Sequence, residues 1–160
     1  MKIFLSRYLN NIDKKGRTSV PAPYRSVTIP CHDFSGIVAY PSIKHRCIEA
    51  CGMERLEELS RIIQNLDPYS EERDAFETII LGQSMQLSFD SEGRVVLPKH
   101  LMEYANLGDQ ASFIGKGLVF EIWNPSDLDT QLERAKVVAQ ENRGLLKNND
   151  IVRGLDSRER

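Results

Sequence analysis

The sequence predicts an α+β fold made of two tandem β units, with a helical connection between them and a further helix near the C-terminal end. Three observations carry this prediction: a motif that occurs twice at an offset of 77 residues, the paired apolar stretches that follow each copy, and helical periodicity elsewhere. With 160 residues, 41% of them hydrophobic, the chain is long enough to bury a core in one or two small domains.

The repeated motif keeps an aspartate, a glycine, an arginine and a proline in one register. Residues 12–21 read IDKKGRTSVP and residues 89–98 read FDSEGRVVLP. An aspartate can cap a turn by accepting a backbone N–H, a glycine supplies a positive φ, and a proline ends a strand because it cannot donate a ladder hydrogen bond. We therefore predict a strand–turn–strand at each motif, with these structural residues: Asp13, Gly16 and Pro21 in copy one, and Asp90, Gly93 and Pro98 in copy two.

Two apolar stretches follow each motif, and we expect each stretch to form a strand. Each β unit has about 45–50 residues, too few to bury its own faces, so two copies, or copies from two chains, would complete one core. The connection through Ile43 to Arg46 in copy one is longer than its counterpart and is typical of an insertion. The predicted segments are repeat 1 at 5–52, a helical connection at 53–82, repeat 2 at 83–126, and a C-terminal helix with a polar tail at 127–160.

Apolar periodicity predicts the helices. Residues 53–66 place leucines and isoleucines on one face. Asp67 and Pro68 end this helix, and a second helix ends near Gly82. Ser126 is expected to cap the last helix. From about residue 148 the sequence is polar, which is typical of a frayed tail.

The charges are distributed unevenly along the chain. The total is 21 Lys and Arg against 23 Asp and Glu, which by itself argues against a polyanion partner. Residues 1–30, however, hold six basic residues and a single acid, and the acids concentrate in the helical segments. Because the local field steers a polyanion more than the net charge does, a basic N-terminal region remains compatible with DNA.

Several classes of protein are disfavoured. The longest apolar run is far below the ~20 residues that span a bilayer, so we predict no membrane partner. Three cysteines without a secretory signal indicate a reducing, cytoplasmic compartment. The sequence has no G-x-S-x-G, P-loop or H-E-x-x-H motif, so we predict neither enzymatic activity nor a cofactor.

One group of residues has the chemistry of metal ligands, but its spacing does not favour a metal site. No C-x-x-C knuckle occurs, and Cys47 and Cys51 alternate with apolar residues as strand residues do. We interpret these cysteines as buried structural thiols and assign no metal. The group consists of Cys31, His32, His45, Cys47 and Cys51.

The stretch DKKGRTSVPAPYR at residues 13–25 is similar to D-x-K-G-R-x-x-x-P-x-x-x-R, the signature of the MraZ family of bacterial regulators within the SpoVT/AbrB superfamily. Copy two resembles the second signature of that family through Asp90, Gly93, Arg94 and Pro98, and through FEIW at 120–123. The resemblance runs from about residue 4 to 132. It implies a swapped-hairpin β barrel built from both copies, ring-shaped homo-oligomers, and binding to repeated promoter sites of the division and cell-wall gene cluster.

The predicted DNA-binding residues are Lys14, Lys15, Arg17 and Arg94. Lysines in a tight turn suit phosphates, and the planar fork of Arg17 suits a guanine edge; the alternative is that Arg17 pairs with Asp13 to hold the turn. Arg94 lies between acidic residues, so a structural role is an equal alternative. We expect Arg25 to support the fold or a subunit interface.

The function predicted from the sequence is therefore that of a DNA-binding transcriptional regulator in the cytoplasm and nucleoid. Its predicted partners are double-stranded promoter DNA and further copies of the chain. The alternative is an interaction scaffold or an antitoxin-like protein that binds a partner protein. The first turn separates the two functions, because a pure scaffold needs no run of cations there.

Overall fold

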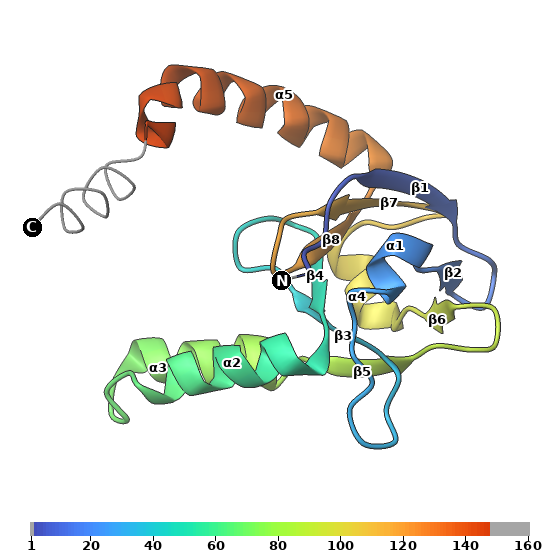
Figure 1. Ribbon diagram of the computed structural model, residues 1–160, viewed down its shortest axis with the longest axis horizontal. Helices are drawn as coiled ribbons and strands as arrows, with labels where there is room; N and C mark the ends of the chain where they lie inside the picture. The colour runs from blue at the N-terminus through green and yellow to red at the C-terminus, as the bar shows by residue number, and fades with distance from the viewer. Residues whose placement is uncertain (1, 148–160) are drawn as a thin grey trace, which may run out of the picture. The chain divides into compact units, whose positions relative to one another are not determined.

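The computed structural model describes residues 2–147 and confirms the α+β class (Figure 1). The chain divides into two compact units, one ending at Pro125 and the other beginning at Ser126. Within residues 2–147, no helix is both long and apolar enough to cross a membrane. The strands and short helices of copy one are β1 (Arg7–Asn11), β2 (Arg17–Ser19), α1 (Ala22–Arg25), β3 (Gly36–Pro41) and β4 (Ile48–Cys51), and those of copy two are β5 (Met85–Ser88), β6 (Arg94–Val96), α4 (Lys99–Tyr104), β7 (Gln110–Gly115) and β8 (Phe120–Trp123).

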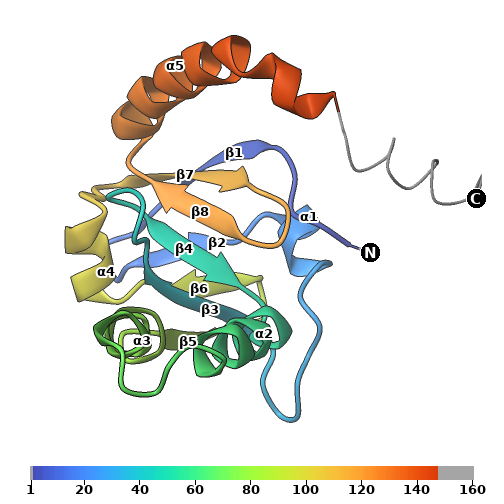
Figure 2. The ribbon, with the colours of Figure 1, turned by 90° about the vertical axis from the view of Figure 1, so that its left-hand side faces the viewer.

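The two copies interleave in the sheets. The larger sheet has the order β1-β7-β8-β4-β3-β5, and β2 pairs with β6 in a second sheet of two strands. Figure 2 shows β7, β8, β4 and β3 lying in succession. Copy-one strands therefore pair with copy-two strands at β1–β7, β3–β5, β4–β8 and β2–β6, always antiparallel. Closure of these sheets into a barrel, which the family resemblance implies, stays a prediction.

The strand registers follow an internal two-fold symmetry. In the two-stranded sheet, Arg17 lies opposite Val96 and Ser19 lies opposite Arg94. Exchanging the copies at the offset of 77 converts one of these pairs into the other. A similar symmetry holds for β4 and β8 at an offset of 72, where Glu49 lies opposite Glu121 and exchanging the copies converts the pair Ile48–Ile122 into the pair Ala50–Phe120. Each copy thus provides pairing strands for the other, as expected for units too short to bury their own faces.

The main core gathers apolar residues from both copies around Tyr24. The Tyr24 ring packs against Phe113 and Phe120 of copy two and against Phe4 near the N-terminus. Its hydroxyl donates to the Ser6 carbonyl oxygen at 2.6 Å, which satisfies the polar end of a fully buried side chain.

The connection between copies is helical, as predicted, with different boundaries. It comprises α2 (Met53–Gln64), α3 (Glu71–Phe76) and a π-helical turn, η1 (Glu77–Leu81), which ends at Gly82. The predicted apolar face of α2 is only partly covered: Ile63 is buried, whereas Ile62 is 55% exposed. Ser70 caps α3, because its side chain accepts the backbone N–H of Arg73.

The second compact unit contains most of α5 (Pro125–Glu141) and a 3₁₀ turn, η2 (Arg143–Leu146). The prediction that Ser126 caps this helix was wrong, because the helix begins before it and its N-cap position is residue 124. Pro125 is already helical, and proline suits a first helical position because it has no N–H to leave unpaired. The polar tail predicted from residue 148 lies outside the described residues.

Candidate nucleic-acid interface

The two-stranded sheet of β2 and β6 brings together the two arginines that the repeat singles out. Thr18 and Val95 lie opposite each other in this sheet and are each 1% exposed. Because side chains alternate along a strand, their neighbours point to the other side of the sheet. We call this outward side the ribbon face; it consists of Arg17, Ser19, Arg94 and Val96.

In the turn of copy one (residues 13–17), Asp13 is the organising residue. Its Oδ1 accepts the backbone N–H groups of Lys15 at 2.9 Å and Arg17 at 2.8 Å. Its Oδ2 accepts Nε–H of Arg17 at 2.6 Å. Gly16 has a φ of +81°, a conformation that side chains with a Cβ rarely adopt. The pairing of Arg17 with Asp13 is therefore present, and it holds the turn closed.

The turn of copy two (residues 90–94) repeats this geometry. Asp90 Oδ1 accepts the backbone N–H groups of Glu92 and Arg94, each at 2.9 Å, and Oδ2 accepts Nε–H of Arg94 at 2.8 Å. Gly93 has a φ of +76°. The same aspartate, glycine and arginine at the same spacing thus produce the same turn twice.

The aspartate pairing leaves the outer ends of the two arginines in different environments. The ion pair of Arg17 uses Nε, and within the described residues its two terminal nitrogens make no hydrogen bond. In Arg94, one terminal nitrogen is also paired with Glu92 at 3.1 Å. The Arg17 side chain is 35% exposed and the Arg94 side chain 31%. Both guanidinium groups are partly exposed to solvent. Of the two, only that of Arg17 has both terminal nitrogens without a hydrogen-bond partner among the described residues.

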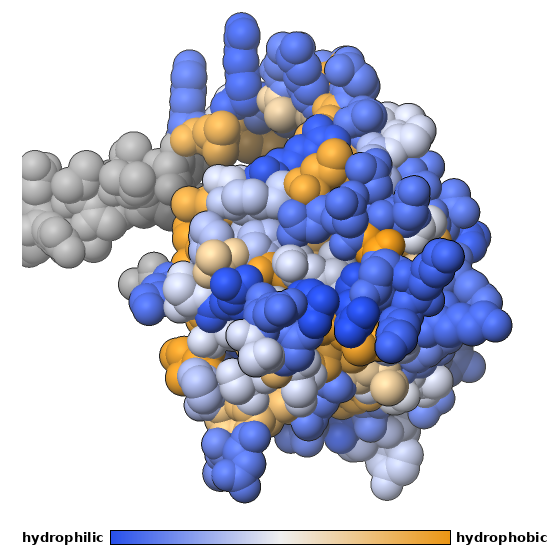
Figure 3. All heavy atoms as spheres, turned by 90° about the vertical axis from the view of Figure 1, so that its right-hand side faces the viewer, coloured by the Kyte–Doolittle hydropathy of each residue, from blue (hydrophilic) through white to orange (hydrophobic). Residues whose placement is uncertain are grey.

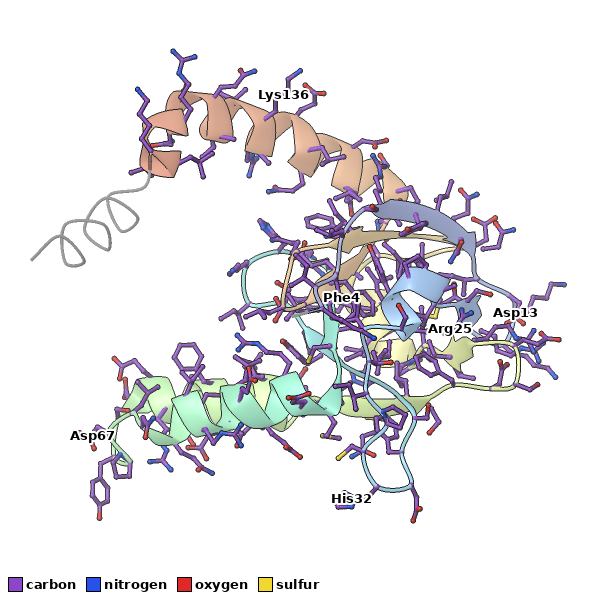
Figure 4. All side chains as sticks on the ribbon, viewed as in Figure 1. Phe4, Asp13, Arg25, His32, Asp67 and Lys136 are labelled. Carbon is purple, nitrogen blue, oxygen red and sulfur yellow. The ribbon has the colours of Figure 1, made fainter. Side chains whose placement is uncertain are left out.

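The cations around the ribbon face come mainly from copy one. Lys14 and Lys15 are exposed in the first turn, whereas Ser91 and Glu92 hold the equivalent positions in the second. In Figure 4, Asp13 lies at one edge of the first compact unit, and Asp67, between α2 and α3, lies at the opposite end. Figure 3 looks at the side that carries the turns; hydrophilic side chains cover most of it, with apolar atoms between them.

Comparison with known proteins identifies the family. The family model "MraZ protein, putative antitoxin-like" matches residues 80–148. The chain is 57% identical over 149 residues to a protein of Rickettsia bellii (strain OSU 85-389) and 55% identical over 148 residues to one of Rickettsia canadensis (strain McKiel), both named "Transcriptional regulator MraZ". Each comparison covers 92% of this chain and 99% of the relative.

The chain belongs to the MraZ family of transcriptional regulators. The resemblance to this family, which the sequence carries in both copies, is thereby confirmed. The model of the MraZ family itself covers the second copy and α5, whereas the relatives also cover the turn of Lys14, Lys15 and Arg17.

The remaining residues that the sequence singled out lie beside the two turns. Pro21 and Pro98 directly precede α1 and α4, two short helices that the sequence did not predict. Arg25 is half-buried at the end of α1, and its Nη1 donates to the carbonyl oxygen of Val20. Sequence reasoning missed Asn10, whose Nδ2 donates to the Ser19 carbonyl oxygen at 2.6 Å and links β1 to the ribbon.

The cysteines do not form a metal site among the residues described. Cys47 and Cys51 are fully buried, and burial raises the pKa of the Cys51 thiol to about 12 and that of the Cys47 thiol still further. Neither thiol is therefore a thiolate at neutral pH. No group of three or more His, Cys, Asp or Glu side chains comes together in residues 2–147.

The turn aspartates should make folding sensitive to acid. The backbone N–H of Arg17 lowers the pKa of Asp13 below 3.8, and the backbone N–H of Arg94 does the same for Asp90. A pKa that is lower in the folded chain contributes stability above the pKa of the unfolded chain, and this stability is lost as the pH falls through the folded value. We expect thermal stability to decline below about pH 4.

The measurement is the melting temperature between about pH 2.5 and 7, for the native chain and for the double variant Asp13→Asn, Asp90→Asn. The double variant should melt lower at neutral pH and lose less on acidification. An equally steep acid loss in the variant would show that other carboxylates carry the effect.

Proposed function

We propose that this protein is a sequence-specific DNA-binding repressor of the division and cell-wall gene cluster. It acts in the nucleoid as a ring-shaped homo-oligomer that binds repeated promoter sites through its basic turns. The observation that carries the proposal is the ribbon face, where Arg17 and Arg94 stand on paired strands beside a turn that bears Lys14 and Lys15. Family membership supplies the regulatory role.

The dimensions of the ribbon suit the major groove. That groove admits a two-stranded β ribbon, and an arginine can bind the O6 and N7 atoms of a guanine with both arms of its fork. Arg17 and Arg94 occupy diagonal positions on the two strands, and such neighbours lie about 7 to 8 Å apart, with their Cβ atoms somewhat closer. That separation is close to two base-pair steps of about 3.4 Å, so the two forks can address nearby bases.

Oligomerisation would supply the affinity that one copy lacks. Beside its four cations, the interface carries the acids Asp13, Asp90 and Glu92, so a single ribbon offers few net positive contacts. When several identical ribbons are held together, each binding event raises the effective concentration of the next at a repeated site. A chain with a formal net charge of −2 can therefore bind a polyanion strongly.

The test is binding to the DNA upstream of the protein's own gene, compared with a shuffled duplex of equal length. We expect tight binding to the native duplex. We also expect an affinity that falls by roughly a thousandfold or more between 50 and 200 mM salt, because binding releases the counterions of six or more phosphates contacted across the oligomer. Fluorescence anisotropy over a salt series measures both. A flat salt response, or equal affinity for the shuffled duplex, would contradict the proposal.

The second candidate is an antitoxin-like protein that binds a partner protein. It is supported by the description of the family model that matches copy two and α5. The two candidates differ in the DNA they predict. Short direct repeats about 10 bp apart upstream of the gene favour the regulator, whereas a neighbouring toxin-like reading frame favours the antitoxin.

A further inference from the structure

Arg25 of copy one lies against the turn of copy two. A Cβ placed on Gly93 would be 2.5 Å from Cζ, 2.6 Å from Nη1 and 2.7 Å from Nε of Arg25. These distances mean that the guanidinium group occupies the space next to the Gly93 backbone. Any residue with a side chain at position 93 would have to displace it, in addition to adopting a φ of +76°.

Two hydrogen bonds to the Val20 backbone hold Arg25 and Gly93 next to each other. Val20 accepts a hydrogen bond from Nη1 of Arg25 through its carbonyl oxygen, and its N–H donates to the Gly93 carbonyl oxygen at 3.1 Å. Arg25, Val20 and Gly93 therefore form a closed set of contacts that ties the end of α1 to the neighbouring turn. Arg94, the next residue along the chain, begins β6 from this point.

The equivalent place in the other half of the fold holds a neutral side chain. At the offset of 77, Met102 corresponds to Arg25, and its Sδ lies 3.7 Å from where a Cβ of Gly16 would be. The backbone tie is the same there, since Leu97 N–H donates to the Gly16 carbonyl oxygen at 2.8 Å. The two turns thus have one architecture but different supports, a thioether beneath copy one and a guanidinium beneath copy two.

The turn that lacks lysines of its own is the one that has an arginine beneath it. The turn of copy one has its own cations in Lys14 and Lys15, whereas the turn of copy two has Ser91 and Glu92. Arg25 borders the same cavity of about 490 Å³ as Glu92. A guanidinium group of copy one therefore lies beside the second turn, which has no lysine of its own.

We propose that Arg25 is the positioning residue of the copy-two turn, holding the Gly93 backbone so that Arg94 is presented to DNA and offsetting the charge of Glu92. This inference rests on the proposed DNA-binding function. It gives both turns a part in binding despite their unequal composition. A positioning role differs from a general stabilising role in one respect that can be measured: replacing Arg25 should affect one of the two turns and not the other.

The decisive test is a pair of double-mutant cycles in the full-length protein. Arg25→Met places at position 25 the residue that copy two carries, and we expect it to weaken promoter binding about tenfold, as expected when a positioned arginine loses its base contact. Combined with Arg94→Ala, the two losses should not multiply, because both remove the same contact. Combined with Arg17→Ala, and measured at low salt where residual binding is strong enough to quantify, the losses should multiply.

Amide hydrogen exchange tests the positioning without DNA. In Arg25→Met, the amides of Gly93 and Arg94 should exchange faster, while those of Gly16 and Arg17 keep their rates. Arg25→Lys keeps the charge without the planar group and should also speed exchange in the copy-two turn, with a smaller loss of affinity. The matched control is Arg61→Met, the same substitution at an exposed arginine of α2 outside the ribbon face, which should leave affinity unchanged.

The outcomes separate the two proposals. Losses that multiply equally with Arg94→Ala and with Arg17→Ala, or faster exchange in both turns, would show that Arg25 acts on the whole fold, and would overturn its positioning role. If the native protein does not discriminate promoter from shuffled DNA, the proposed function fails. In that case the exchange rates at Gly93 and Arg94 still decide whether residue 25 holds the second turn.

Discussion

Replacing Arg17 with alanine should abolish binding to promoter DNA while leaving the oligomer intact. The substitution removes the fork whose terminal nitrogens are unoccupied on the ribbon face. One bidentate arginine–guanine contact contributes about 1 to 3 kcal/mol, a tenfold to hundredfold effect at a single site. In an oligomer that binds repeated sites the loss recurs at every turn, so the combined effect exceeds that of one contact.

A gel-shift assay on the promoter, together with the mass of the oligomer in solution, checks this expectation. The matched control is Arg61→Ala, which removes an exposed arginine from α2, an element outside the ribbon face. This variant should bind as the native protein does. Affinity retained by Arg17→Ala in an oligomer of normal size would mean that Arg17 only pairs with Asp13, an exposed ion pair that contributes little to stability.

Replacing Gly36 with alanine should strongly destabilise the fold. A Cβ at this position would lie 2.0 Å from the carbonyl oxygen of Leu87, which is backbone and has no flexible end to move aside. Gly36 begins β3 where this strand pairs with β5 of the other copy, opposite Ser88. The added methyl group must therefore push two paired strands apart, and we expect a loss of about 3 kcal/mol or more in the free energy of unfolding.

Thermal or urea unfolding measures this loss, and a fall of roughly 6 to 12 °C in Tm corresponds to it for a chain of this size. The control is Gly108→Ala, since a Cβ at Gly108 would meet no atom within 4 Å. That variant should unfold close to the native temperature. Equal stability of the two variants would show that β3 and β5 separate without cost.

Much of the architecture was predictable because the residues of the repeated motif specify its turns through local interactions. Asp13 and Gly16, with their counterparts 77 residues later, specify a turn through local hydrogen bonds and a positive φ, which are properties of a few neighbouring residues. The strands after each motif follow from their apolar stretches. The helical connection follows from its periodicity, although Ile62 shows that an apolar residue at helical spacing can remain exposed.

The rest depends on partners that are distant in the sequence. The short helices α1 and α4 have four and six residues, too few for a periodic pattern. The position of Arg25 beneath Gly93 arises from the pairing of β2 with β6, which joins segments of different copies. The sequence predicts that Arg25 supports the fold or an interface, but it does not predict which segment Arg25 contacts. The motif that contains Arg25 belongs to copy one, whereas the turn it supports belongs to copy two.

The interleaving of the two copies has a consequence for the synthesis of the chain. A nascent chain that has released only its first half carries β1, β2 and β4, whose cross-copy partners are still unmade. Since exposed strand edges invite pairing with other chains, this half is most vulnerable to aggregation until β8 has left the ribosome. Translation must therefore deliver about three quarters of the polypeptide before the six-stranded sheet is complete, and slow decoding in the second copy would prolong that vulnerable interval.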